Sequence, residues 1–205
     1  MTQAAEYFPT VLVPAPPRSR ATTYDKAWWG MLVVVTTEAM VFLVLLAAYF
    51  FLRASSKQWP PAGTELPELF QTSIFTVVLI GSSIPVFWAD AAIKRGHVGQ
   101  AQLGLLLSWL MGVAFLVHTY LDFQALHFGW RDSAYGSIYY TIIGLHAIHV
   151  LVGLLFSALI QLKLQRGMLD AHRHKTLDVF SLYWHFVDAV WIFVFSSLIL
   201  SVHWR

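Results

Sequence analysis

The sequence predicts an all-α protein in which five helices cross a membrane as one bundle. Three observations support this expectation: 58% of the residues are hydrophobic, only 12% are charged, and the charges cluster between long apolar runs. A soluble domain usually has about 25% charged residues, so we expect lipid to cover most of this surface. The scattered net charge of +2 predicts no nucleic-acid partner, and without cysteine the chain has no thiolate site.

Five segments have the length and composition of membrane-spanning helices. A span needs about 20 predominantly apolar residues. The segments that meet this requirement are residues 26–52, 69–93, 101–121, 137–162 and 177–203. Pro85 lies inside the second segment, which predicts a kink there. We therefore expect a polytopic membrane bundle over residues 26–205.

The remaining N-terminal stretch and the positive charges predict an orientation. Residues 1–25 contain four prolines but no continuous apolar run, so we expect a mostly disordered tail instead of a signal peptide. With that tail in the cytoplasm, nine of the thirteen Lys and Arg residues fall on the cytoplasmic side and four on the opposite side. Lys and Arg concentrate on cytoplasmic loops. The sequence thus predicts a cytoplasmic N-terminus and a C-terminus outside.

Four ionisable residues lie at membrane depth on three of the predicted helices. At 1.5 Å per residue, Glu38 and Asp188 lie roughly 17 Å from the cytoplasmic ends of their helices. His185 is one turn shallower, and His149 comes within about one turn of the level of Glu38. Such residues rarely face lipid. We expect them to point into the bundle and to form a buried polar cluster.

Two interpretations of this cluster remain open. It could pass protons across the membrane, or it could fix the packing of the helices, as intramembrane polar contacts frequently do. A relay should continue to both surfaces, and Asp122 near the outer end and Asp178 near the inner end are too few to show this. The structural interpretation is therefore favoured, with His146 and Asp90 as further polar positions.

The histidines raise the possibility of a haem or metal site. His146 and His149 are three residues apart on one predicted helix, and His118 and His185 lie on others. Ligation of haem by two histidines is feasible in a helical bundle. However, no pair has a matched depth beside an obvious cleft. We expect no cofactor, no metal and no catalytic centre in this chain.

Several motifs resemble one family of respiratory proteins. The run YWHFVDAVW from Tyr183 to Trp191 closely resembles the YWHFVDxVW signature of cytochrome c oxidase subunit III. Earlier parts of the chain match other family motifs in the same order: Gly30, Met31, Glu38, Ala48 and Tyr49 in the first predicted helix, Trp59, Pro60 and Pro61 in the next loop, Tyr135 and Gly136 just before the fourth helix, and Ser137, His146 and His149 within it. The resemblance covers about residues 26–203.

The chain departs from the family pattern at a few polar positions. Gln71 stands where the family usually has Asn, and Asp90 replaces the first His of its WAHH motif. Thr119 and Asp122 occupy the Gln and Glu positions of QxxEY, and Asp178 replaces a Glu. Several of these changes keep the chemical type, so they do not threaten the fold.

The resemblance implies an accessory role in the bacterial inner membrane. Haem and copper of such an oxidase belong to subunits I and II, whereas subunit III packs beside subunit I, binds phospholipids and supports proton uptake. Larger members have seven helices, so the resemblance implies a short form whose two other helices belong to subunit I or are missing. An accessory subunit of a quinol oxidase or nitric oxide reductase is an alternative, as are a haem-binding membrane cytochrome and a small transporter. A transporter would predict an internal repeat or a pair of broken helices, and neither is evident in the sequence.

Overall fold

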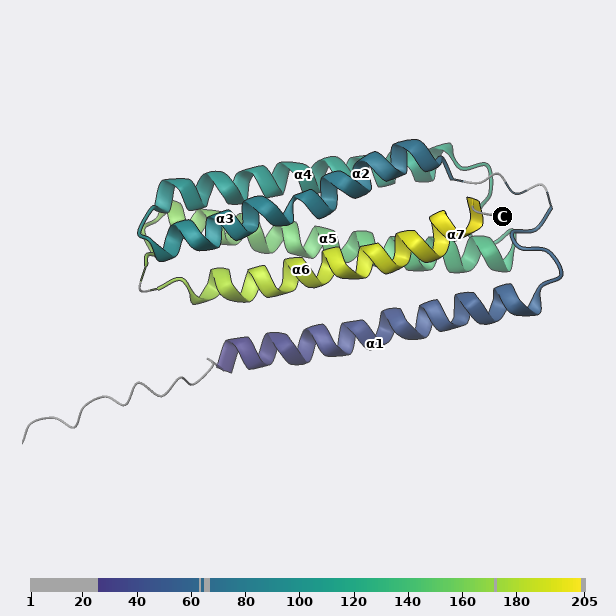
Figure 1. The fold of residues 1–205 in the computed structure, drawn as a ribbon, viewed down its shortest axis with the longest axis horizontal. Coiled ribbons are helices and arrows are strands. Elements are labelled where there is room, and N and C mark those ends of the chain that lie inside the picture. Colours follow the sequence, from purple (N-terminus) through teal and green to yellow (C-terminus); the bar gives the residue numbers. More distant parts are fainter. Residues whose placement is uncertain (1–25, 63, 65–66, 172, 204–205) are drawn as a thin grey trace, which may run out of the picture.

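The structure confirms an all-α fold with five helical spans. The computed structural model describes residues 26–62, 64, 67–171 and 173–203. These residues form α1 (Lys26–Ser55), α2 (Leu69–Gly81), α3 (Ser83–Lys94), α4 (Val98–Ala125), α5 (Ala134–Gln165), α6 (Lys175–Phe195), the π-helical turn η1 (Ser196–Leu200) and α7 (Ser201–His203). Five rods, counting α2 with α3 and α6 with α7, are long and apolar enough to cross a membrane (Figure 1). The predicted tail over residues 1–25 lies outside the described residues, and the orientation of the termini stays a prediction.

Two ends of the bundle serve as landmarks. The α3–α4 and α5–α6 connections lie at one end with the start of α1, which we call the Lys94 end (Figure 1). The α1–α2 and α4–α5 connections lie at the other, the Trp59 end. Gly96 and Gly167 adopt positive φ angles of 83° and 65° just after α3 and α5. Glycine adopts this left-handed conformation without steric cost, so both helices end sharply at the Lys94 end.

The second span is interrupted at Ser82, three residues before the proline that predicted a kink. α2 ends at Gly81 and α3 begins at Ser83. Pro85 has no N–H group for the Gly81 carbonyl four residues earlier, and its ring crowds that carbonyl. The bend therefore falls on the N-terminal side of Pro85. This single interruption agrees with the kink that Pro85 predicts.

Two tryptophans of α6 hold the second span against the centre of the bundle. Trp184 is fully buried, and its Nε1 donates a hydrogen bond of 2.9 Å to Ser82 Oγ at the break. Two turns further along α6, Trp191 Nε1 donates to Thr76 Oγ1 at 3.0 Å. Buried indole N–H groups need such partners in lipid, because no water is available there. The hydroxyl groups of Thr76 and Ser82 therefore fix how α6 packs against the second span.

Helix α1 lies along one side of the bundle, against α5 and α6 (Figure 1). Only Phe42 and Tyr49 are buried along its length. Large apolar side chains cover the rest of its surface, among them Val33, Met40, Val44 and Phe51. Most of α1 is therefore free to contact lipid or another protein.

Candidate functional site

Glu38 of α1 and His149 of α5 form a hydrogen-bonded pair. Nε2 of His149 lies 3.1 Å from Oε2 of Glu38, and Nδ1 lies 2.8 Å from the Leu145 carbonyl oxygen. A carbonyl oxygen only accepts, so Nδ1 carries a hydrogen atom. The contact with Glu38 must then contain a second proton, either on the carboxyl group or on an imidazolium ring. The pair thus joins α1 to α5 and holds one proton between the two side chains.

A second polar group joins α3 to α6 through one serine. Ser83 Oγ donates its one hydrogen to Oδ2 of Asp188 at 2.5 Å. Because Ser83 Oγ has no second hydrogen to donate, it accepts from Nδ1 of His185 at 2.8 Å. Nε2 of His185 then accepts from the Ser181 hydroxyl at 3.1 Å. The ring of Phe87 stacks on His185 with 4.0 Å between the centroids. In a Ser-His-Asp triad the histidine lies between the other two, whereas here the serine does, so the order is not that of an activated nucleophile.

The four residues expected in one cluster thus belong to two groups, which corrects that expectation. No hydrogen bond between described atoms joins the Glu38–His149 pair to the Ser83 group. Counting residues along a helix gives depth but not the direction of a side chain around the axis. Asp188 is only 4% exposed, because it faces α3, whereas the Glu38 side chain is 36% exposed at the edge of α1. Asp188 is thus enclosed between helices, whereas Glu38 contacts α5 at the edge of the bundle.

The secondary polar positions lie elsewhere. His146 is buried, its Nε2 is 3.3 Å from the Val187 carbonyl oxygen, and its ring packs on Trp191 at 4.6 Å. At the Lys94 end, Lys94 bridges Asp90 at 2.7 Å and Asp178 at 2.9 Å. This bridge connects α3 to the first turn of α6, where an acidic residue also favours the helix dipole. Lys94 and Ser83 were not predicted as links between helices. Two adjacent hydroxyl side chains, Ser82 and Ser83, close to Pro85 within a span could have indicated a polar contact there.

The histidines do not gather into a metal site in the described part of the chain. No group of three or more His, Asp or Glu side chains there lies close enough to hold a metal ion. His118, on α4, instead stacks on Phe75 of α2 with 4.2 Å between ring centroids. Asp122, one turn away on α4, lines the same pocket as His118. That the chain binds no haem or copper stays a prediction.

The fold and its buried hydrogen bonds define a polytopic α-helical membrane protein whose polar side chains tie helices together. Comparison with known families gives the particular group. The profile of cytochrome c oxidase subunit III matches residues 20–204. The chain belongs to the cytochrome c oxidase subunit III family, in agreement with the motifs of its first, fourth and fifth spans.

Individual relatives agree with this assignment. The cytochrome c oxidase subunit 3 of Thermostichus vulcanus is 36% identical over 148 residues, which are 72% of this chain and 73% of the relative. The subunit 3 of Coturnix japonica is 32% identical over 142 residues, or 69% of this chain and 54% of the relative. That of Spodoptera frugiperda is 30% identical over 147 residues, or 71% and 97%. For Coturnix japonica and some further relatives, the matched region thus spans about half the length of the relative.

Proposed function

We propose that the chain is the non-catalytic subunit III of a proton-pumping haem-copper oxidase in a bacterial inner membrane. In this role, subunits I and II of the complex carry the haem and copper that oxidise cytochrome c and reduce oxygen. This chain packs against subunit I, stabilises it, binds phospholipid and supports proton uptake. The names of its relatives support cytochrome c as the electron donor.

The partly exposed side chain of Glu38 is the observation that best supports a partner on α1. Ionisable side chains within a span are costly in hydrocarbon and almost always face protein or water. The Glu38 side chain is 36% exposed at mid-helix in this chain alone. One turn away on the same side of the helix, Val34 and Val41 are each 45% exposed. We infer that subunit I covers this face and removes Glu38 from lipid.

The polar groups act, in this proposal, as anchors between helices. The Glu38–His149 pair connects α1 to α5, and the Ser83 group connects α3 to α6. The Lys94 bridge repeats the α3–α6 connection near one surface. We infer that these anchors keep the shape of the surface that subunit I requires, and that support of proton uptake follows from this shape.

Phospholipid binding is supported by a basic pocket at the Lys94 end. The cavity has a volume of about 350 Å³ and is lined by Lys163, Arg173 and Lys175 together with Met168, Leu169 and Thr176. Arg173 also pairs with Asp170 at 2.8 Å. Juxtamembrane clusters of Lys and Arg attract anionic head groups. The cytoplasmic leaflet would supply these lipids if the predicted orientation is correct.

Purification of the chain with a bulky substitution on the outer face of either α1 or α2 tests this proposal. The chain is tagged and isolated in a mild detergent, and the proteins that accompany it are identified. We expect a haem-rich polytopic subunit and a cupredoxin-like subunit. Val41→Trp, on the Glu38 side of α1, should reduce their recovery several-fold. Val77→Trp is a matched control, because Val77 is equally apolar and 71% exposed on α2.

Two results would contradict the proposal. Equal loss of partners with both variants, or loss with Val77→Trp alone, would remove α1 as the contact with subunit I. Stoichiometric haem in the chain after all partners have been stripped from it would contradict a non-catalytic subunit.

A further inference from the structure

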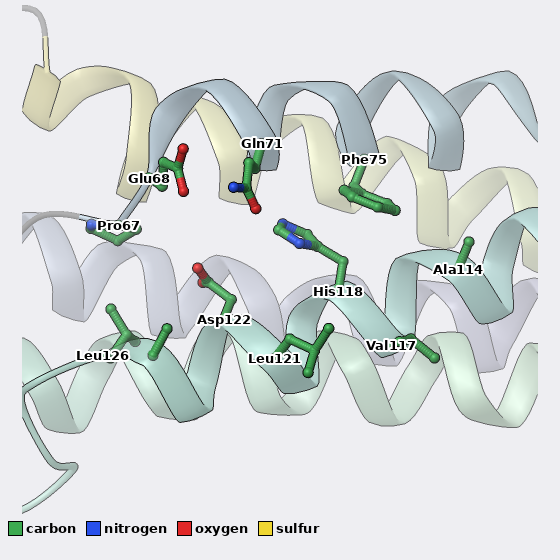
Figure 2. Close-up of a pocket in the computed structure, with 11 residues that line it drawn as sticks. Pro67, Glu68, Gln71, Phe75, Ala114, Val117, His118, Leu121, Asp122 and Leu126 are labelled. Carbon is green, nitrogen blue, oxygen red and sulfur yellow. The ribbon is translucent and has the colours of Figure 1, made fainter.

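A pocket between α2 and α4 at the Trp59 end lies apart from both hydrogen-bonded groups. Its volume is about 680 Å³, which is within the range of small-molecule sites. Its lining residues come from the start of α2 and the last third of α4: Pro67, Glu68, Gln71 and Phe75, then Ala114, Val117, His118, Leu121, Asp122, Ala125 and Leu126. Figure 2 shows these two rows of side chains facing each other.

The polar side of the pocket carries acceptors and no positive charge. Glu68 and Asp122 each contribute a carboxyl group, Gln71 contributes an amide, and neither Lys nor Arg is among the lining residues. His118 is only 8% exposed, and its Nε2 has no hydrogen-bond partner. Its ring is held against Phe75 and extends between Gln71 and Asp122 in Figure 2. A buried nitrogen without a partner is costly, which indicates that a ligand completes it.

We propose that this pocket binds the primary ammonium group of a membrane amphiphile. An ammonium group carries one positive charge and three N–H donors. Carboxylate oxygens of Glu68 and Asp122 and the unpaired Nε2 of His118 are three acceptors on two sides of one cavity. The ligand charge thus balances an acidic lining, and each donor has a candidate acceptor.

The remaining lining favours an organic cation over a metal ion. No three His, Asp or Glu side chains of the described residues are close enough for metal coordination. A cavity of about 680 Å³ is also far larger than a bare ion needs. The aromatic ring of Phe75 also lines this cavity, and aromatic rings attract ammonium groups.

An apolar wall and the depth of the pocket favour a lipid as the carrier of the amine. Val117 and Leu121 line the cavity and are 52% and 58% exposed, so the wall continues onto the lipid-facing surface of α4. Asp122 lies three residues before the end of α4, or about 4.5 Å along the axis. Glu68 immediately precedes α2. The acidic groups therefore lie at the level of head groups, and an acyl chain can follow α4 toward the membrane centre.

Native mass spectrometry of the intact complex tests the site. The complex is placed in bilayers of equal composition except for phosphatidylethanolamine or its mono-, di- and trimethylated forms. Each methyl group removes an N–H donor but keeps the charge. We expect retained lipid to fall at least five-fold from the primary amine to the trimethylated form. Asp122→Asn and Glu68→Gln should each abolish this preference.

Asp178→Asn is the matched control, because it removes a carboxylate at the opposite end of the bundle. It should leave the preference for the primary amine unchanged. Thermal unfolding of each variant checks the fold, and Glu68→Gln alone decides the matter if Asp122→Asn does not assemble.

Competition by added amines shows whether the bound ammonium group belongs to a lipid or to a small soluble amine. Octylamine should displace the lipid at least ten-fold more effectively than ethylamine if an amphiphile is the ligand. Equal displacement by ethylamine would overturn the assignment to a lipid. Equal retention of all four head groups, or displacement by Zn²⁺ at lower concentration than by octylamine, would overturn the ammonium site.

Discussion

The indole ring of Trp184 lies directly against the backbone of Gly153. A Cβ atom at Gly153 would be 2.7 Å from Cζ3 and 2.8 Å from Cε3 of this ring. The ring cannot move easily, because Nε1 is bonded to Ser82 and the side chain is fully buried. The close contact between α5 and α6 therefore requires a residue without a Cβ atom at position 153.

We expect Gly153→Ala to lower the stability of the folded chain by about 2 kcal/mol. Overpacking a tight core costs up to about 3 kcal/mol, and alanine recovers about 1 kcal/mol of helix propensity. Thermal unfolding in detergent measures the effect. Gly144→Ala is the control on the same helix, because a Cβ there meets nothing within 4 Å. An equal effect of the two substitutions would show that Trp184 adapts.

Removal of the Glu38 carboxyl group should weaken assembly more than chemistry. Glu38→Ala leaves Nε2 of His149 without its partner, and hydrogen bonds within membranes are worth about 0.6 to 1.7 kcal/mol. We expect a shorter turnover lifetime and lower recovery of the chain with the complex, with the initial rate of oxygen reduction nearly unchanged. Glu38→Gln should be milder, because its amide N–H can donate to Nε2 of His149.

Thr37→Ala is the control for this experiment, since the Thr37 hydroxyl bonds only its own helix at the Val34 carbonyl oxygen. Oxygen consumption over successive turnovers gives both the initial rate and the lifetime. Immediate loss of all activity in an intact complex would instead favour a direct role of Glu38 in proton transfer.

The Ser83 hydroxyl should couple energetically to Asp188. Ser83→Ala leaves Oδ2 of Asp188 and Nδ1 of His185 without their common partner. A double-mutant cycle with Asp188→Ala, which removes the acceptor, should give a coupling energy of about 0.6 to 1.7 kcal/mol. Ser73→Ala on the same span is the control, because the Ser73 hydroxyl bonds the Leu69 carbonyl oxygen of its own helix. Additive effects of Ser83→Ala and Asp188→Ala would exclude the coupling.

The Lys94 bridge should contribute little and should depend on salt. Its side chain is 44% exposed, and exposed ion pairs are worth about 0 to 1 kcal/mol. We expect Lys94→Met to lower the unfolding temperature slightly at low ionic strength and not measurably in high salt, where charges are screened. Arg95→Met removes a neighbouring charge that takes no part in the bridge. A large effect of Lys94→Met that persists in high salt would indicate a buried role instead.

The number of spans could be predicted because lipid imposes a minimum apolar length. The helix ends could not, because hydropathy marks the hydrocarbon core and the helices continue into the head groups. α5 has 32 residues, against 26 in the predicted range 137–162. Its additional first turn is stabilised by Ser133, whose hydroxyl accepts from the Gly136 N–H at 3.0 Å.

The depth of the polar side chains in the membrane could be predicted from the sequence, whereas the direction in which they point could not. Residue counting brought Glu38 and His149 to similar levels, and the structure places them in contact. It also brought Asp188 to that level, yet Asp188 faces Ser83. Rotation about each helix axis is set by packing, such as that of Trp184 on Gly153, which no residue count contains. His118 was considered as a haem ligand, whereas the structure places it in the pocket beside Phe75.

In the proposed function, this chain supports a haem-copper oxidase without carrying its redox centre. The complex can be purified with and without the chain, and its haem and copper content and its oxygen consumption over many turnovers can be compared. We expect the same haem and copper content and a nearly unchanged initial rate without the chain, followed by faster loss of activity. Loss of haem or copper in proportion to the missing chain, or no initial activity without it, would overturn the proposed function.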